Sequence, residues 1–188
     1  MSDLYGRAEL IWHPDAPTSK IAYQGAPQTI EVMIHAALED QKHFETRQLA
    51  EVVCEGLDSK DYVSEYLALY NFLLQRTRYM RDPRRTELVR APYILSKQIL
   101  SGHRPSVDCD DMATWLMAAT LAVGGTGWFA TVAFNKMMYR GAVQFSHVFT
   151  TALEPRSRAK IVLDPVAAET TRDMLRRVKV AKLWGPIN

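Results

Sequence analysis

Three side chains of this sequence could together carry out nucleophilic catalysis: a cysteine at the start of a predicted helix, and a histidine and an aspartate on two later, successive strands. Cys109 falls at the start of a predicted helix, where the unpaired N–H groups of the first turn and the helix dipole favour a thiolate. His147 lies in an alternating run typical of a strand, and Asp164 ends a short apolar run that predicts the next strand. A thiolate, a base and a carboxylate that orients the base make up a nucleophilic triad.

The residues around these positions resemble the transglutaminase-like superfamily. The matching motifs are Asp108-Cys109-Asp110-Asp111, Ser146-His147-Val148 and Leu163-Asp164-Pro165. In that superfamily Cys, His and Asp act in this chain order on a papain-like fold, so the resemblance implies that Cys109, His147 and Asp164 are catalytic. The run from Tyr79 to Pro92 more particularly resembles small transglutaminase-like proteins of tailed phages and prophages, which usually carry Gly where this chain has Val107.

The resemblance implies acyl transfer on amide bonds. Cys109 would attack an amide carbonyl and form a thioester, which water or a lysine amine then resolves. We favour hydrolysis, because cross-linking must exclude water from the thioester and the sequence has no aromatic motif suited to that. The expected enzyme is a peptidase or amidase acting on a protein in a phage or prophage assembly. The alternative is a structural or assembly component of a phage particle that retains the fold with weak or no activity.

The charges next to the thiol act in opposite directions. Asp108 is the predicted N-cap, with its side-chain oxygen accepting a first-turn N–H. Asp110 and Asp111 disfavour a second negative charge on the sulfur. We expect an imidazolium at His147 to outweigh them, because an ion pair in a half-buried cleft exceeds a dipole effect of about 1 kcal/mol. Asp164 would hold the ring through its other nitrogen.

Two further features of the site are open at the level of sequence. The backbone N–H of Cys109 is the natural first donor to an oxyanion, and His103 and Ser106 are candidates for the second. A zinc site made of Cys109, His103 and His147 is the metal alternative, but it lacks the paired spacing of zinc ligands. We therefore predict neither a metal nor a cofactor.

Composition narrows the possible partners. The chain has 188 residues, of which 47% are hydrophobic, enough for one domain with a core. Its net charge of +2 gives no argument for nucleic acid, and it has no apolar run of membrane length. We expect synthesis in the host cytoplasm and, in the phage setting, association with the virion. The expected partner is a protein substrate or a phage structural protein, and the oligomeric state is open.

Cys54 is interpreted as a small buried hydrophobe, with both thiols reduced.

The upstream part is predicted to be mainly helical. Residues 1–28 read as a proline-punctuated arm with a short strand at Ala8–Trp12, and Thr29 is the predicted cap of the first helix. Further helices are predicted over 46–55, from Asp58 or Ser59 to Thr77, and over 92–100. The aromatic stripe of the third helix is interpreted as core, because it is one-sided and not interleaved with basic residues.

The downstream part is predicted to form an antiparallel sheet. The expected strands cover 128–134, 145–153 and 161–164, with a hairpin connection over 135–143 and with His147 and Phe149 on one face. Packed on the Cys109 helix, they give an α+β, papain-like core. The predicted organisation is a single domain over 29–188, comprising a helical part (29–100), a catalytic core (101–168) and a C-terminal tail (169–188). We predict that this tail docks through Leu183 and Trp184 on the core or on a partner; the alternative is a surface strand or helix with scattered basic residues.

A basic cluster lies between Arg76 and Arg90. Its members are Arg76, Arg78, Arg81, Arg84, Arg85 and Arg90, partly offset by Asp82 and Glu87. One interpretation is a solvated surface with local ion pairs, which contribute little to stability. The other is a surface for an acidic partner, and the sequence leaves both open.

Overall fold

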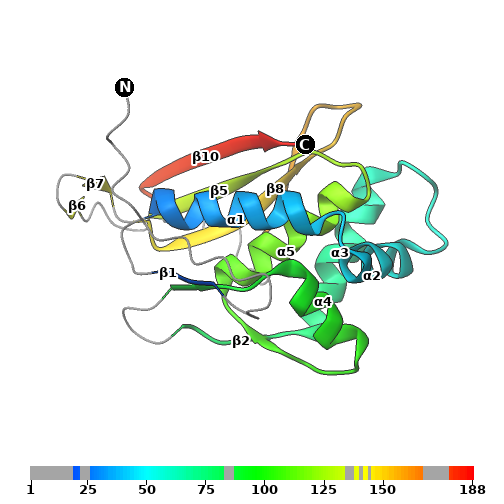
Figure 1. Cartoon of the computed structure of the whole chain (residues 1–188). Coiled ribbons are helices and arrows are strands. Elements are labelled where there is room, and N and C mark those ends of the chain that lie inside the picture. Colours follow the sequence, from blue (N-terminus) through cyan, green and yellow to red (C-terminus); the bar gives the residue numbers. More distant parts are fainter. Residues whose placement is uncertain are drawn as a thin grey trace.

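A computed structural model of the chain describes residues 19–21, 26–82, 87–133, 138–139, 142–143, 145–166 and 178–188. In Figure 1 the main sheet runs along the top, α1 crosses in front of it, α5 lies beneath, and α2, α3 and α4 gather at one end. The described helices are α1 (Ala26–Asp40), α2 (Phe44–Cys54), α3 (Tyr62–Arg76), α4 (Pro92–Leu100) and α5 (Cys109–Ala122). The strands are β1 (Ser19–Ile21), β2 (Arg78–Tyr79), β3 (Glu87–Val89), β4 (Ser106–Val107), β5 (Gly127–Ala133), β6 (Met138–Tyr139), β7 (Ala142–Val143), β8 (His147–Leu153), β9 (Lys160–Leu163) and β10 (Val180–Ile187).

Helix α5 lies at the centre of the molecule. Every residue from Asp110 to Leu121 is buried, because α5 belongs to two hydrophobic clusters at once. One cluster joins it to α2, α3 and α4 around Trp115, and the other joins it to α1 and the sheet around Met117 and Phe129. The helix is therefore held on all sides. It ends at Ala122, and Gly124 just beyond it has a φ of 82°, which suits glycine.

The first helix begins about one turn earlier than the sequence predicts. Thr29 is not its cap: α1 starts at Ala26, and Thr29 is buried within the helix. Pro27 accounts for the earlier start, because a proline in the first helical turn sacrifices no hydrogen bond and already has a helical φ. One face of the helix packs into the core, where Met33 and Ala37 are fully buried.

The third helix also has a different cap from the predicted one. Asp61 takes this role in place of Asp58 or Ser59: its carboxylate accepts the N–H of Ser64 over 3.3 Å and its hydroxyl over 2.6 Å. The sequence offers several cap residues within a few positions, and only the observed start of the helix selects one. The interpretation of the stripe as core is confirmed at its fully buried members, which are Tyr66, Leu69 and Leu73.

The main sheet confirms the predicted fold class. Its strand order is β10-β5-β8-β9, and all neighbours are antiparallel. Strands β5, β8 and β9 match the three predicted strands within two residues, and β6 pairs with β7 inside the predicted hairpin connection. The protein is α+β, with five described helices packed on a four-stranded antiparallel sheet.

The C-terminal segment differs from the predicted docking tail. Strand β10 pairs with β5 and forms one edge of the main sheet. The half-buried Trp184 donates from Nε1 to Oγ1 of Thr131 over 2.9 Å, whereas Leu183 is 51% exposed. Successive side chains of a strand point to opposite faces, so only one of these two neighbours can pack on the core.

Part of the N-terminal arm pairs with the body of the protein. Strand β1 pairs antiparallel with β3, which directly precedes α4. The predicted strand at Ala8–Trp12 lies outside the described residues. Among the described residues, no helix has the length and apolar character needed to cross a membrane.

Candidate active site

The topology brings the start of α5 and His147 to the same end of the sheet. Residues 123–126 connect α5 to β5, so β5 begins near the end of α5 and runs back toward Cys109. His147, the first residue of β8, pairs with a residue near the end of β5. On the same strand, Thr150 donates its hydroxyl to the carbonyl of Ala113 over 2.7 Å, which fixes β8 against the first turns of α5.

His147 and Asp164 form a buried hydrogen-bonded pair. Nε2 of His147 lies 2.8 Å from Oδ2 of Asp164, and the two side chains are 7% and 0% exposed. Asp164 directly follows β9, whose antiparallel pairing with β8 carries the chain back toward His147. The orienting contact that the sequence predicts between these residues is therefore present. Because Asp164 engages Nε2, Nδ1 is the ring nitrogen that would serve the thiol.

Two further groups hold Asp164 in place. Its Oδ1 accepts the backbone N–H of Val166 over 3.1 Å, and its backbone carbonyl accepts the hydroxyl of Tyr70 over 3.3 Å. Tyr70 belongs to the aromatic stripe of α3, and its contact with Asp164 is not predictable from that stripe. No local pattern could have shown it, because the two residues are 94 positions apart and meet only through the packing of α3 near β9.

The two cysteines have different surroundings. Cys109 is half-buried at the first position of α5, and Cys54 is half-buried near the end of α2, with Sγ 4.0 Å from the carbonyl of Glu65. Burial, and secondarily the charge of Glu65, raises the pKa of Cys54 to about 11. Cys54 is therefore a thiol at neutral pH and provides an internal reference for Cys109. Both are free cysteines, as the sequence predicts.

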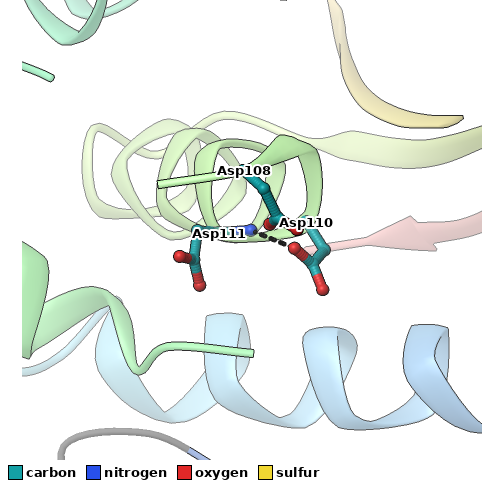
Figure 2. A group of neighbouring side chains, drawn as sticks. All are labelled: Asp108, Asp110 and Asp111. Atoms are coloured by element: carbon teal, nitrogen blue, oxygen red, sulfur yellow. Dashed lines mark hydrogen bonds between the residues drawn. The ribbon is translucent and has the colours of Figure 1, made fainter. Parts of the chain in front are cut away.

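Three aspartates gather at the start of α5 (Figure 2). One carboxylate oxygen from each of Asp108, Asp110 and Asp111 lies within 4.8 Å of the others, and all three residues are buried. Asp108 occupies the N-cap position as predicted, with an extended backbone, but its side chain makes no capping hydrogen bond. Instead, the N–H of Asp111 donates to Oδ1 of Asp110 over 3.0 Å. The predicted capping bond is not formed: this N–H is directed to Asp110, although it lies near enough to Asp108 to lower the pKa of that carboxyl.

Arg90 partly balances this acidic cluster. Its backbone N–H donates to Oδ1 of Asp111 over 2.6 Å, and its guanidinium lies 3.9 Å from Oδ2. Burial is the main cause that raises the pKa of Asp108 to about 7, and the carboxylates of Asp111 and Asp82 add to it. Burial also raises the pKa of Asp111 to about 6, against the lowering effect of Arg90. Half-buried Arg90 is thus an internal partner and not part of an exposed basic surface.

The acidic cluster is also the one group of three potential metal ligands found among the described residues. Carboxylates of this kind suit a hard cation such as Mg²⁺ or Ca²⁺. Protons and Arg90 can satisfy the same charges, and the raised pKa values indicate that protons do so in part. Within the described part of the chain, Cys109, His103 and His147 do not form a zinc-type group. His103 is exposed in the turn after α4, and Ser106 lies in β4, so their oxyanion roles stay predictions.

The raised pKa of Asp108 predicts how stability depends on pH. Its ordinary value is 3.8 and its value in the folded chain is about 7, so between these values the unfolded chain releases a proton that the folded chain keeps. Raising the pH from 4 to 8 should therefore lower the free energy of unfolding, on the order of a few kcal/mol. Asp108→Asn should remove much of this fall.

Urea denaturation of both proteins at pH 4, 6 and 8 measures the effect. Asp61→Asn is the matched control: the hydrogen bonds from Ser64 lower the pKa of Asp61, so this change should not reduce the fall. Equal pH dependence in wild type and Asp108→Asn would contradict the prediction.

A short strand missed by the sequence analysis lies beside Cys109. Tyr79 of β2 is near enough to the thiol for their charges to interact. The pKa of Tyr79 is raised, mainly by burial. A hydrogen bond from Arg81 lowers this pKa, and the negative charges of Cys109 and Asp108 raise it further. The sequence marked this stretch only through its family resemblance and its arginines.

Comparisons with known proteins add a result on the fold. No protein-family model and no curated protein sequence matches the chain. A crystal structure from Parabacteroides distasonis, described as that of a "putative protease", superposes with a TM-score of 0.51 at 9% identity. The match covers 77% of this chain and 27% of that protein. A "putative cysteine protease" from Cytophaga hutchinsonii gives a TM-score of 0.45 at 15% identity, over 89% of this chain and 58% of the other.

The chain thus spans less than two thirds of either matched protein. At these identities the comparison concerns the arrangement of helices and strands, not the activity. The α+β fold of this chain is similar to that of the Parabacteroides distasonis protein.

Proposed function

We propose that this protein is a cysteine-dependent peptidase or amidase that acts on a protein through a thioester at Cys109. His147 is the base and Asp164 orients it. The observation that carries the proposal is the buried 2.8 Å contact between His147 and Asp164, at the end of the sheet where α5 begins. The buried carboxylate holds the imidazole ring by one nitrogen, which leaves the other nitrogen to serve the thiol.

In the proposed reaction, Sγ of Cys109 attacks the amide carbonyl carbon after its proton has passed to Nδ1 of His147. Asp164 accepts the hydrogen bond from Nε2–H and stabilises the imidazolium. The C–N bond then breaks, the amine leaves with the proton from His147, and a thioester remains. A water molecule, deprotonated by His147, hydrolyses the thioester to a carboxylic acid and restores the thiol.

The backbone N–H of Cys109 suits the role of oxyanion donor. Helix geometry directs the first-turn N–H groups out of the N-terminal end of α5. There the carbonyl oxygen of a bound amide would develop its charge. Half-burial of Cys109 leaves it accessible, and we therefore favour water over a lysine amine as the second reactant.

The biological setting of this reaction rests on the sequence resemblance alone. That resemblance suggests a protein of a phage or prophage assembly as the substrate. It also suggests the alternative, a structural component of the particle with little turnover. Both stay predictions, and reactivity at Cys109 separates them.

The test is labelling with a peptide chloroacetamide at pH 7, with the modified cysteine identified by peptide mass mapping. We expect Cys109 to be labelled in strong preference to Cys54, which is a thiol at this pH, and His147→Ala to abolish that preference. If both cysteines react equally and His147→Ala has no effect, the enzyme proposal fails and the structural role stands.

A further inference from the structure

The strand beside Cys109 has an edge that pairs with no other described strand. Strand β2 pairs in parallel with β4 on one side, and these two strands form a sheet of their own. The N–H of Arg78 donates to the carbonyl of Pro105 over 2.9 Å, and that of Met80 to the carbonyl of Val107 over 2.8 Å. Along a strand, successive residues direct their N–H and C=O groups to opposite sides. The N–H and C=O of Tyr79 therefore point away from β4.

This edge is accessible. The exposed fractions of Tyr79 and Met80 are 41% and 59%, and Arg78 and Arg81 are exposed as well. An unpaired strand edge with apolar side chains is a ready template for another extended chain. Such an edge is expected where a polypeptide binds.

The edge also lies at the thiol. Tyr79 pairs with Val107, which is two residues before Cys109, so β4 leads directly from β2 into the start of α5. The phenol of Tyr79 lies within electrostatic range of Cys109, and Arg81 donates to this phenol. A peptide paired with β2 would thus run beside Tyr79, the β2 residue that interacts with Cys109.

The charge around this edge is positive. The exposed arginines are Arg76, Arg78, Arg81 and Arg104. Arg104 is tied to the same segment, since its Nε donates to the carbonyl of Thr77 over 3.1 Å. Asp82 is half-buried and Asp108 is buried, so the charges that face solvent here are mainly those of the arginines. Exposed guanidinium groups recognise carboxylates.

Building on the proposed function, we propose that the β2 edge, from Arg78 to Arg81, binds the polypeptide substrate as an added strand, and that its arginines select acidic segments. The main-chain groups of Tyr79 bind any extended backbone, and the side chains supply the selectivity. The substrate class is thus an extended, exposed protein segment with Asp or Glu near the attacked amide. This explains the arginine-rich stretch as a substrate surface.

The test uses three peptide chloroacetamides that differ at two residues flanking the electrophile: glutamate, glutamine or lysine. The measured quantity is the rate of modification at Cys109, divided by the rate with iodoacetamide on the same protein. This ratio cancels changes in the thiol itself. We expect the ratio for the glutamate peptide to be about five times that for the glutamine peptide, as two exposed ion pairs would give. The ratio for the lysine peptide should be lower still.

Variants assign the effect to the strand. Arg78→Gln combined with Arg81→Gln should bring the three ratios close together, whereas Arg47→Gln, an exposed arginine of α2, should leave them apart. Tyr79→Pro removes the outward N–H and should lower all three ratios, and Tyr79→Ala, which keeps that N–H, serves as its control. Peptides N-methylated at single amides test the same hydrogen bonds on the unaltered chain.

Two failures can be told apart. If Cys109 is no more reactive toward iodoacetamide than Cys54, the proposed function itself fails. If Cys109 is reactive but the three peptides give equal ratios, and N-methylation at every position has no effect, then the substrate surface alone is wrong.

Discussion

Replacing His147 with alanine should lower the rate at which iodoacetamide alkylates Cys109 at pH 6 by about tenfold to a hundredfold. In the proposed site an imidazolium at His147, whose ring lies 2.8 Å from Asp164, would stabilise the thiolate. Without it the thiol should return toward its ordinary pKa of about 8.5, and below that pKa each unit removes about nine tenths of the remaining thiolate. The measurement is the alkylation rate at Cys109 between pH 5 and 10.

Three other variants sharpen this experiment. Asp164→Asn should have an intermediate effect, because the ring stays but is poorly held. Neutralising Asp110 or Asp111 should leave the thiolate equally or more populated, because each removes a nearby negative charge. Cys54, whose pKa burial raises to about 11, should stay slow throughout. A Cys109 profile like that of a simple thiol, unchanged by the loss of the imidazole, would show that no thiolate–imidazolium pair exists.

Replacing Trp115 with alanine should destabilise the fold by about 3–5 kcal/mol, the usual range when a large buried aromatic residue is truncated. Trp115 is fully buried in α5, its ring lies 6.5 Å from that of Phe72, and its Nε1 donates to Oγ of Ser96 over 2.8 Å. The variant therefore loses apolar contact with α3 and a hydrogen bond to α4. Urea denaturation followed by circular dichroism measures the change.

Two controls separate the contributions. Ser96→Ala leaves the indole N–H of Trp115 buried without its acceptor and should cost about 1–3 kcal/mol. Leu67→Ala truncates a 43% exposed side chain of α3 and should change stability by at most about 0.5 kcal/mol. If Trp115→Ala were no more damaging than Leu67→Ala, α5 would not be the centre of the core.

Local patterns in the sequence predicted much of the architecture. The first-turn position of Cys109, the glycines after the helix and the alternation around His147 are short-range signals, and α5, β5, β8 and β9 lie where these signals place them. The α+β class follows from the order of these elements. The candidate residues could also be named from the sequence, because Cys109 begins a helix and His147 and Asp164 lie at two later, neighbouring strands with a recognisable motif at each; their chemistry stays a prediction.

Only the tertiary structure decided which groups meet. Tyr70 reaches the carbonyl of Asp164 across 94 positions, and Arg90 turns inward to Asp111 although its sequence neighbours suggested a basic surface. The N–H of Asp111 is directed to Asp110, and Asp108 makes no capping bond although it occupies the cap position. The tail containing Trp184 became β10 because β5 offered it an edge to pair with. Hydrogen-bond partners and burial depend on contacts between segments that are distant in the chain, and local periodicity carries no record of them.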